Sequence, residues 1–165
     1  MQRHRDLQGR HWHVWVRRSC LGLVALICLL ALANVFGQRP ERLSAQNDRA
    51  TLEVFAPDRI RGGLLFQQRI TVTARKDIED ARLLLDSGWA EGFQINTIEP
   101  SPIGEASADG RLSFDLGHIP KGEQHVLWLQ FQVNPTNVGQ RKQDVDLYDG
   151  DTYLLTRKHD LFVLP

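Results

Sequence analysis

The sequence predicts an all-β protein, an antiparallel β-sandwich that is preceded by one N-terminal transmembrane helix. Three observations support this. An uncharged apolar run extends from Cys20 to Phe36, apolar and polar residues alternate in most segments beyond residue 50, and Gly- or Pro-containing turns separate those segments. They divide the 165-residue chain into a basic tail over 1–18, a helix over 19–37, a linker over 38–50 and a sandwich over 51–165.

Charge is distributed unevenly along the chain although it sums to zero. Twenty Lys and Arg balance twenty Asp and Glu, so no overall basic field favours nucleic acid, and we expect no nucleic-acid partner. Residues 1–18 hold five arginines against one aspartate, whereas residues 39–165 are net acidic. A hydrophobic content of 42% excludes a low-complexity or wholly disordered chain.

The N-terminal apolar run has the features of a membrane anchor. Its 17 residues reach about 25 Å as a helix, near the lower limit for crossing a bilayer. Arg17 and Arg18 precede it directly, so the positive-inside rule keeps the N-terminus in the cytoplasm and exports the C-terminal part. Trp12 and Trp15 fit an aromatic anchor at headgroup level. We therefore expect residues 19–37 to lie in the bilayer of a bacterial cell membrane as a single-pass signal anchor.

A cleaved signal peptide is the alternative interpretation of the same run. Ala31-Leu32-Ala33 supplies a small-residue pattern, with cleavage expected after Ala33. Both interpretations place residues 40–165 outside the cytoplasm. Cys20 and Cys28 lie inside the run, and no other cysteine occurs in the sequence, so the exported part has to fold without a disulfide.

Period-two alternation predicts strands along the exported part. Ile70, Val72 and Ala74 alternate with polar neighbours, and residues 127–133 form the longest such pattern. Further strands are expected over 52–54, 78–85, 93–98, 112–116, 145–148 and 161–164. Residues 75–85 are the best helical rival, and Asp149-Gly150 predicts a hairpin with a type I′ turn. Short strands with regular turns indicate two antiparallel sheets packed face to face.

Three segments together match the motifs of one known kind of domain: Gln68–Ala74, Leu116–Gly122 and Val133–Gly139. They fill the places of a Y-x-I-x-V-x-N strand, a glycine-containing strand break and a long strand ending in V-x-P-x-x-x-G. In this the sequence resembles the conserved repeat domain of bacterial surface proteins and the bacterial cell-adhesion-related domain, over about residues 62–148. Ala74 departs from the family's Asn, and Asp86-Ser87-Gly88-Trp89 replaces its usual D-x-L-P-x-G turn. The resemblance implies an immunoglobulin-like sandwich that serves as a structural or binding module, and it transfers no catalytic residue.

Two tryptophans and one phenylalanine are the candidate partner contacts. Trp89 and Phe93 lie in the glycine-containing segment 86–100, where a large ring is either buried under the sandwich rim or offered to a partner. Trp128 lies on the polar face of its strand. There it either belongs to a contact patch or is covered by the C-terminal strand over 161–164.

Patterns for catalysis are weak in this sequence. His118, His125 and His159 stand in unrelated contexts and no G-x-S-x-G motif occurs, so we expect no enzyme, no catalytic residue and no cofactor.

Patterns for metal binding are equally weak. The acidic run 144–151 invites a calcium site but fails the D-x-D-x-D-G pattern, and a solvent-facing hairpin edge explains it better. His11-Trp12-His13 would be a poor metal site in a tail, and no metal is expected.

The combined prediction is a membrane-anchored extracytoplasmic module. It is expected to be non-catalytic and to bind or support a protein partner, either a membrane protein or another component of the cell envelope. The alternative is a carbohydrate-binding module in which an exposed Trp89 or Trp128 stacks on a sugar ring.

Overall fold

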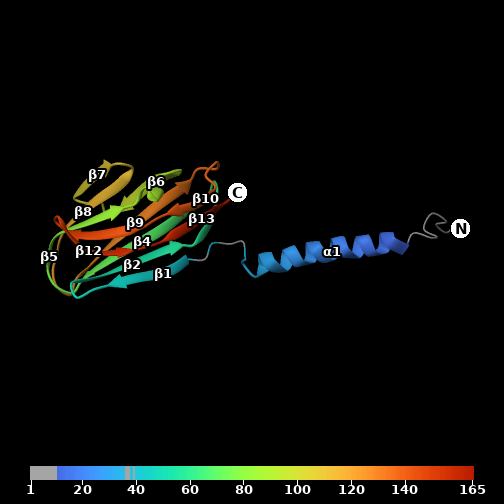
Figure 1. The fold of residues 1–165 in the computed structure, drawn as a ribbon, viewed down its shortest axis with the longest axis horizontal. Coiled ribbons are helices and arrows are strands. Elements are labelled where there is room, and N and C mark those ends of the chain that lie inside the picture. The colour runs from blue at the N-terminus through green and yellow to red at the C-terminus, as the bar shows by residue number, and fades with distance from the viewer. Residues whose placement is uncertain (1–10, 36–37, 39) are drawn as a thin grey trace. The chain divides into compact units, whose positions relative to one another are not determined.

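The computed structural model describes residues 11–35, 38 and 40–165, and the chain divides into two compact units. Residues 1–37 contain helix α1 (His11–Leu32), and residues 38–165 contain the described strands (Figure 1). Most of the predicted basic tail, up to residue 10, lies outside the described residues.

Helix α1 is long and apolar enough to cross a membrane over Trp12–Leu32. It ends before the predicted boundary at residue 37, because Asn34 adopts the left-handed conformation with φ 54°. The Val35 N–H donates to the Leu30 carbonyl at 3.0 Å, and the Asn34 N–H donates to the Ala31 carbonyl at 3.0 Å. This pair of bonds is a Schellman motif, which ends a helix.

The early end of α1 shortens its charge-free part. From Ser19 to Leu32 the helix has no charged residue, and this stretch rises only about 21 Å. A span across a hydrocarbon core of about 30 Å therefore has to include the first turns of the helix. Arg17 and Arg18 would then extend their side chains toward the lipid headgroups.

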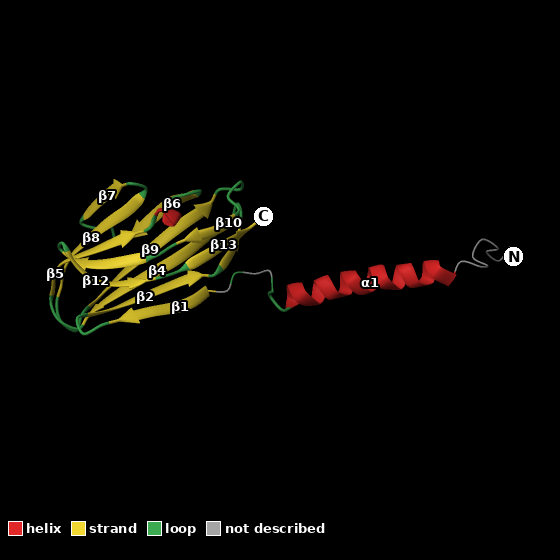
Figure 2. Ribbon diagram, viewed as in Figure 1, coloured by secondary structure: helices red, strands yellow, loops and turns green. Residues whose placement is uncertain are grey.

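The second unit is a β-sandwich, as predicted (Figure 2). One layer is a five-stranded sheet with the order β1-β2-β4-β9-β6, called the first sheet below. The other contains a five-stranded sheet, β12-β11-β5-β8-β7, called the second sheet, and a small sheet, β10-β13-β3. The strands are β1 (Pro40–Gln46), β2 (Ala50–Pro57), β3 (Arg59–Arg61), β4 (Leu65–Ala74), β5 (Ile78–Leu85), β6 (Phe93–Glu99), β7 (Gly104–Ala108), β8 (Arg111–Ile119), β9 (Gln124–Val133), β10 (Gly139–Lys142), β11 (Val145–Asp149), β12 (Thr152–Arg157) and β13 (Asp160–Leu164).

The small sheet prolongs the second layer. Strand β10 pairs with β13 and strand β11 pairs with β12, both antiparallel. Along the chain β10 leads into β11 and β12 leads into β13, so the two pairs follow each other. Between them the Gln143 N–H donates to the His159 carbonyl at 2.7 Å, so hydrogen bonding continues across the gap. Strand β3 then joins β13 in parallel, the one parallel pair among the described strands.

Alternate residues of both layers fill one apolar core. Leu127, Leu129 and Phe131 of β9 are fully buried, whereas Trp128 between them is exposed. The predicted alternation is confirmed here and in β11, whose Val145 is also fully buried. Side chains of the small sheet belong to the same core. This burial is the main source of stability for a domain without a disulfide.

The linker predicted over 38–50 is too long, because residues 40–46 form the edge strand β1. Its whole length pairs with β2, from Pro40 opposite Pro57 to Gln46 opposite Thr51. Most of its side chains are exposed. An edge strand that buries so little needs no strong apolar alternation, so the sequence pattern is weak.

The turns also refine the sequence prediction. The hairpin at Asp149-Gly150 is confirmed, but Asp149 pairs with Thr152, so its two loop residues are Gly150 and Asp151. The turn in which both central residues have positive φ, as type I′ requires, is instead Asp109-Gly110, with φ 52° and 75°. The helical alternative over 75–85 is wrong, because this segment contains strand β5.

Candidate functional site

Five side chains form a row across the first sheet, on the face turned away from the core. Each alternates with a buried or partly buried neighbour on its strand. Because neighbouring strands lie about 4.8 Å apart, the row is about 19 Å long. In strand order, the cross-strand partners that make up this outer-face row are Arg42 (β1), Phe55 (β2), Arg69 (β4), Trp128 (β9) and Glu99 (β6). Figure 1 shows these strands side by side.

Arg69 is held at the centre of the outer-face row by two aromatic rings. Its guanidinium carbon lies 5.4 Å from the ring centroid of Phe55 and 5.1 Å from that of Trp128. These are cation–π distances. The Arg69 side chain forms no hydrogen bond or ion pair with any described residue. Cation–π contact leaves the in-plane N–H donors of a guanidinium available, so they remain free to bind an acceptor.

Trp128 is exposed, with 36% of its surface accessible. The C-terminal strand β13 pairs with β10 and β3 and leaves Trp128 uncovered. The alternative in which the C-terminal strand covers Trp128 is therefore wrong, and its role as a partner contact stays a prediction. The Arg69 guanidinium lies over one face of the ring, so that face is already in contact within the domain.

Trp89 is fully buried, so of its two alternatives the ring buried under the sandwich rim is the one found. Its indole N–H donates to the Asp144 carbonyl at 3.1 Å, and its ring lies 5.7 Å from that of Phe131. The turn that carries it is fixed by Gly88, since a Cβ added there would lie 1.9 Å from the Lys142 carbonyl oxygen. Trp89 is therefore a core residue, and its place as a partner contact has to be corrected.

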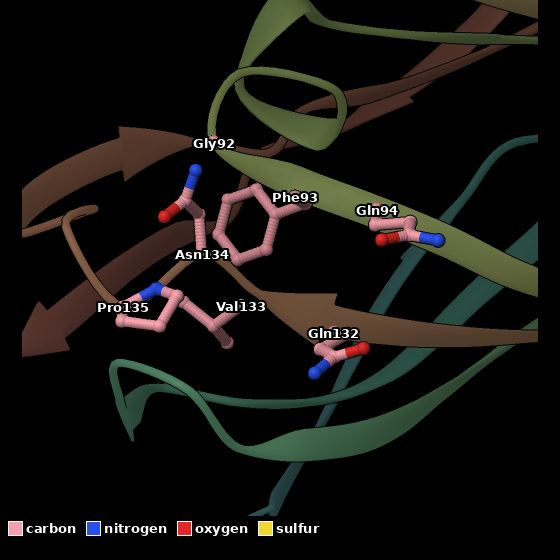
Figure 3. A pocket seen from close by; sticks show the side chains of 7 residues that line it. All are labelled: Gly92, Phe93, Gln94, Gln132, Val133, Asn134 and Pro135. Carbon is pink, nitrogen blue, oxygen red and sulfur yellow. The ribbon is translucent and has the colours of Figure 1, made fainter.

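Phe93 is half-buried and lines a pocket of about 480 Å³ at one end of the first sheet. Figure 3 shows its ring beside Asn134, with Gln94 and Gln132 farther along their strands. The ring also packs on Phe131, with centroids 6.3 Å apart. Its contacts are largely with the core, and the pocket carries no charged side chain.

The three predicted contacts do not form one patch. Phe93 pairs with Val133, whereas Trp128 lies five residues earlier on the same strand, β9. Because a strand rises about 3.4 Å per residue, these positions are about 17 Å apart. The alternation identified Trp128 but missed Arg69 as its neighbour. Both residues lie on polar faces of predicted strands, and only the register between β4 and β9 places them together.

A second pocket, of about 590 Å³, lies between the edge strands β6 and β7. Ile95 and Ile98 of β6 and Leu112 and Phe114 of β8 give it apolar walls. Glu105 is its one ionisable lining residue. The pocket contains no pair of groups suited to acid–base or nucleophilic chemistry.

The three histidines considered as catalytic candidates lie apart in the fold. His118 is exposed in β8, His125 is half-buried in β9, and His159 is buried between β12 and β13. Desolvation lowers the pKa of His125 and of His159, which keeps both rings neutral at pH 7. No described residue supplies a nucleophile hydrogen-bonded to any of these rings.

The acidic run 144–151 is used in internal contacts. Asp144 accepts a hydrogen bond from the His159 N–H at 3.0 Å, and Asp146 accepts one from Arg111 at 2.7 Å. Asp149 pairs with Arg49. The predicted alternation is confirmed, because Val145 and Leu147 are buried and Asp146 lies on the opposite face. The hairpin lies at the edge of the second sheet, but its outermost strand is β12, and β11 lies between β12 and β5.

Metal-ligand side chains do not gather in the described part of the chain. There, no group of three or more His, Cys, Asp and Glu side chains is arranged to hold a metal ion. The motif at His11-Trp12-His13 begins α1, and within it the Trp12 and His13 rings lie 4.0 Å apart.

Comparison with known proteins gives likenesses of structure. No protein-family model matches the sequence. No curated protein matches it either. Among solved structures, the solution structure of CaCohA2 from Clostridium acetobutylicum is 12% identical, with a TM-score of 0.46, over 72% of this chain and 92% of that one.

Two further structures are similar. A non-cellulosomal cohesin from the archaeon Archaeoglobus fulgidus is 9% identical, with a TM-score of 0.41, over 65% of this chain and 86% of that one. The C-terminal domain of wzt is 16% identical, with a TM-score of 0.44, over 78% and 81%. Since none of the three TM-scores reaches 0.5, the fold class rests on the sheets described above.

Proposed function

We propose that this chain is a membrane-anchored, non-catalytic binding module and that the outer-face row contacts a protein partner. One observation carries the proposal: an exposed tryptophan and an arginine without an acidic partner stand together at the centre of an open sheet face. Tryptophan and arginine are the residue types most enriched in energetically dominant interface positions. The motifs that resemble bacterial surface modules agree with a binding role.

The rigidity of the sheet also supports a binding surface there. All five residues of the outer-face row stand on paired strands, so their backbone positions are fixed before a partner arrives. Binding then costs less conformational entropy than it would on a loop. The two stacked rings hold the Arg69 side chain in the same way.

Site-specific photocrosslinking in native membranes tests this proposal. A benzophenone amino acid replaces Gln67, an exposed residue of β4 on the same face as the row. The matched control is Tyr153, an exposed aromatic on the second sheet. A discrete protein adduct at position 67 that is absent at position 153 supports the proposal, and equal or absent adducts at both positions contradict it.

The carbohydrate-binding alternative loses part of its basis in this structure. Trp89 is buried and cannot stack on a sugar. Trp128 is exposed, but Arg69 occupies one face of its ring. Binding to a glycan array that is lost in Trp128→Ala, together with no crosslinked protein, would favour this alternative over a protein partner.

For the first unit, we propose a signal anchor, with the N-terminus in the cytoplasm and the sandwich outside. The length of α1 and the arginines before its apolar part support this. Alkaline carbonate extraction of membranes and the mass of the mature chain test it. A chain that resists extraction and retains residues 1–33 is expected, whereas a soluble chain that begins at residue 34 means cleavage after Ala33.

A further inference from the structure

The arginines of this domain differ in what holds them. Arg82 and Arg111 on the second sheet reach Asp115 and Asp146 at 2.8 and 2.7 Å. Arg69 has no such partner and is held by rings alone. A fixed guanidinium with free in-plane donors is a preorganised receptor for a carboxylate, because it can form two parallel N–H···O bonds without first being ordered.

The outer-face row also contains a second arginine. Arg42 stands two strands from Arg69, on the far side of Phe55, and it forms no ion pair with any described residue. Two strand spacings amount to about 10 Å. Glu53 lies on the same face, opposite Thr71, and is not paired with Arg69. Glu99 stands beyond Trp128, at the other end of the row.

From this geometry we infer that the partner is a protein whose surface presents two carboxylates about 10 Å apart, one for Arg69 and one for Arg42. The inference rests on the proposed function, and it adds the chemistry of the partner. The aromatic rings of Phe55 and Trp128 then take apolar groups of the partner that lie beside its carboxylates. Glu99 faces a basic side chain.

The mixed character of the row favours a protein over an acidic polysaccharide. Along the row, positive, aromatic, positive, aromatic and negative side chains follow one another. A polyuronate carries the same negative charge on every sugar, so Glu99 repels it. Its hydroxyl groups would also lose hydrogen bonds to water on contact with the rings of Phe55 and Trp128. A protein surface can present acidic, apolar and basic side chains in the matching order.

Two synthetic peptides and one polysaccharide test the inference on the full chain in neutral detergent. The first peptide is helical and has two glutamates seven residues apart on one face, about 10 Å from each other, with valines beside them and a lysine at its end. The second exchanges the glutamates and the lysine, and the polysaccharide is polygalacturonate. Nuclear magnetic resonance follows the Arg69 Nε–H and the Trp128 indole N–H during each titration.

The acidic peptide is expected to shift both resonances, the charge-exchanged peptide to shift neither, and added salt to weaken the binding. Arg69→Gln should reduce the affinity roughly tenfold. Arg69→Lys should reduce it less, because Lys keeps the positive charge but lacks the two parallel N–H donors of the guanidinium. Arg59→Gln is the matched control, since Arg59 is an exposed arginine of β3 that pairs with Asp58.

In the titrations, three results overturn the inference: no shift with the acidic peptide, equal binding of both peptides, or tighter binding of polygalacturonate. The resonance mapping uses the unmodified chain, so it decides the matter even where Arg69→Gln fails to fold. A crosslink at position 67 whose yield is the same in Arg69→Gln would leave the proposed function intact and remove the carboxylate pairing alone.

Discussion

The outer faces of the two large sheets carry similar residue types but differ in whether their arginines are paired with carboxylates. On the second sheet, Arg82 pairs with Asp115, and Arg111 pairs with Asp146. On the first sheet, Arg69 stands between two rings and has no acidic partner among the described residues. One face neutralises its charges internally, whereas the other leaves its central charge available.

Under the proposed function, this difference separates positions that support the fold from positions that bind the partner. A charge that is already paired gains little from a new partner, because the existing bond has to be broken first. A guanidinium fixed without a carboxylate has no such cost. If this view is correct, substitutions on the second sheet should lower stability, and those on the outer-face row should lower binding.

The largest effect is expected at the buried tryptophan. Trp89→Ala should destabilise the domain by about 3–5 kcal/mol, because it leaves a large cavity beside Phe131. It also leaves the Asp144 carbonyl without the indole donor. Urea unfolding followed by circular dichroism measures the change. Trp128→Ala is the matched control and should cost much less, and similar losses in the two variants would contradict the distinction between core and surface.

A smaller loss is expected when a paired charge on the second sheet is removed. Asp146 accepts hydrogen bonds from Arg111 at 2.7 Å and from Thr156 at 2.6 Å, and its side chain is only 16% exposed. Asp146→Ala should therefore cost about 2 kcal/mol, since both donors lose their acceptor. Asp151→Ala is the control, because that carboxylate is fully exposed and 3.9 Å from Arg82. Equal unfolding midpoints for the two variants would show that the pairing adds nothing.

A third effect concerns a buried group that is kept uncharged. Desolvation lowers the pKa of His159 below its ordinary value of 6.5. The unfolded chain therefore binds a proton more readily than the folded one. The resulting stability is complete above pH 6.5 and is lost as the pH falls from there through the pKa of the folded state.

Urea unfolding between pH 8 and pH 5 measures this loss. His159→Gln should show a shallower decline than the unmodified chain, and the remaining slope should reflect His125, whose pKa is lowered for the same reason. An unchanged slope in His159→Gln would assign the decline to other groups.

The sequence predicted the sandwich because core strands carry their signal locally. The alternation of Leu127, Leu129 and Phe131 follows from burial of one face of the strand. The pattern is visible in the sequence of that strand alone, without knowledge of the strands that pair with it. The edge strand β1 was missed because pairing with β2, rather than burial, holds it in place. Trp89 was ambiguous because a ring at a turn is buried or exposed depending on what packs against it, here Phe131 and the Asp144 carbonyl.

The outer-face row could not be predicted from the sequence, because its residues come from different strands. Alternation places Trp128 on a polar face, but it does not say which residue of the neighbouring strand stands beside it. A shift of one residue would exchange Arg69 for Gln68, which is buried and bonds to Gln143 at 3.0 Å. Register is set by long-range pairing, so the cation–π contacts appear only in the folded domain.

The smallest effect on stability, and the sharpest test of the comparison, is expected at Arg69. Each cation–π contact at an exposed site contributes about 0.5–1 kcal/mol. Arg69 makes two such contacts, so at the lower value Arg69→Gln should change the unfolding free energy by about 1 kcal/mol. The same variant should lose most of the crosslinking yield at position 67, whereas Asp146→Ala should lose stability and retain the yield per folded molecule. If Arg69→Gln unfolds as readily as Asp146→Ala, the contacts between the guanidinium and the rings stabilise the sheet. The two faces would then differ only in how their charges are neutralised.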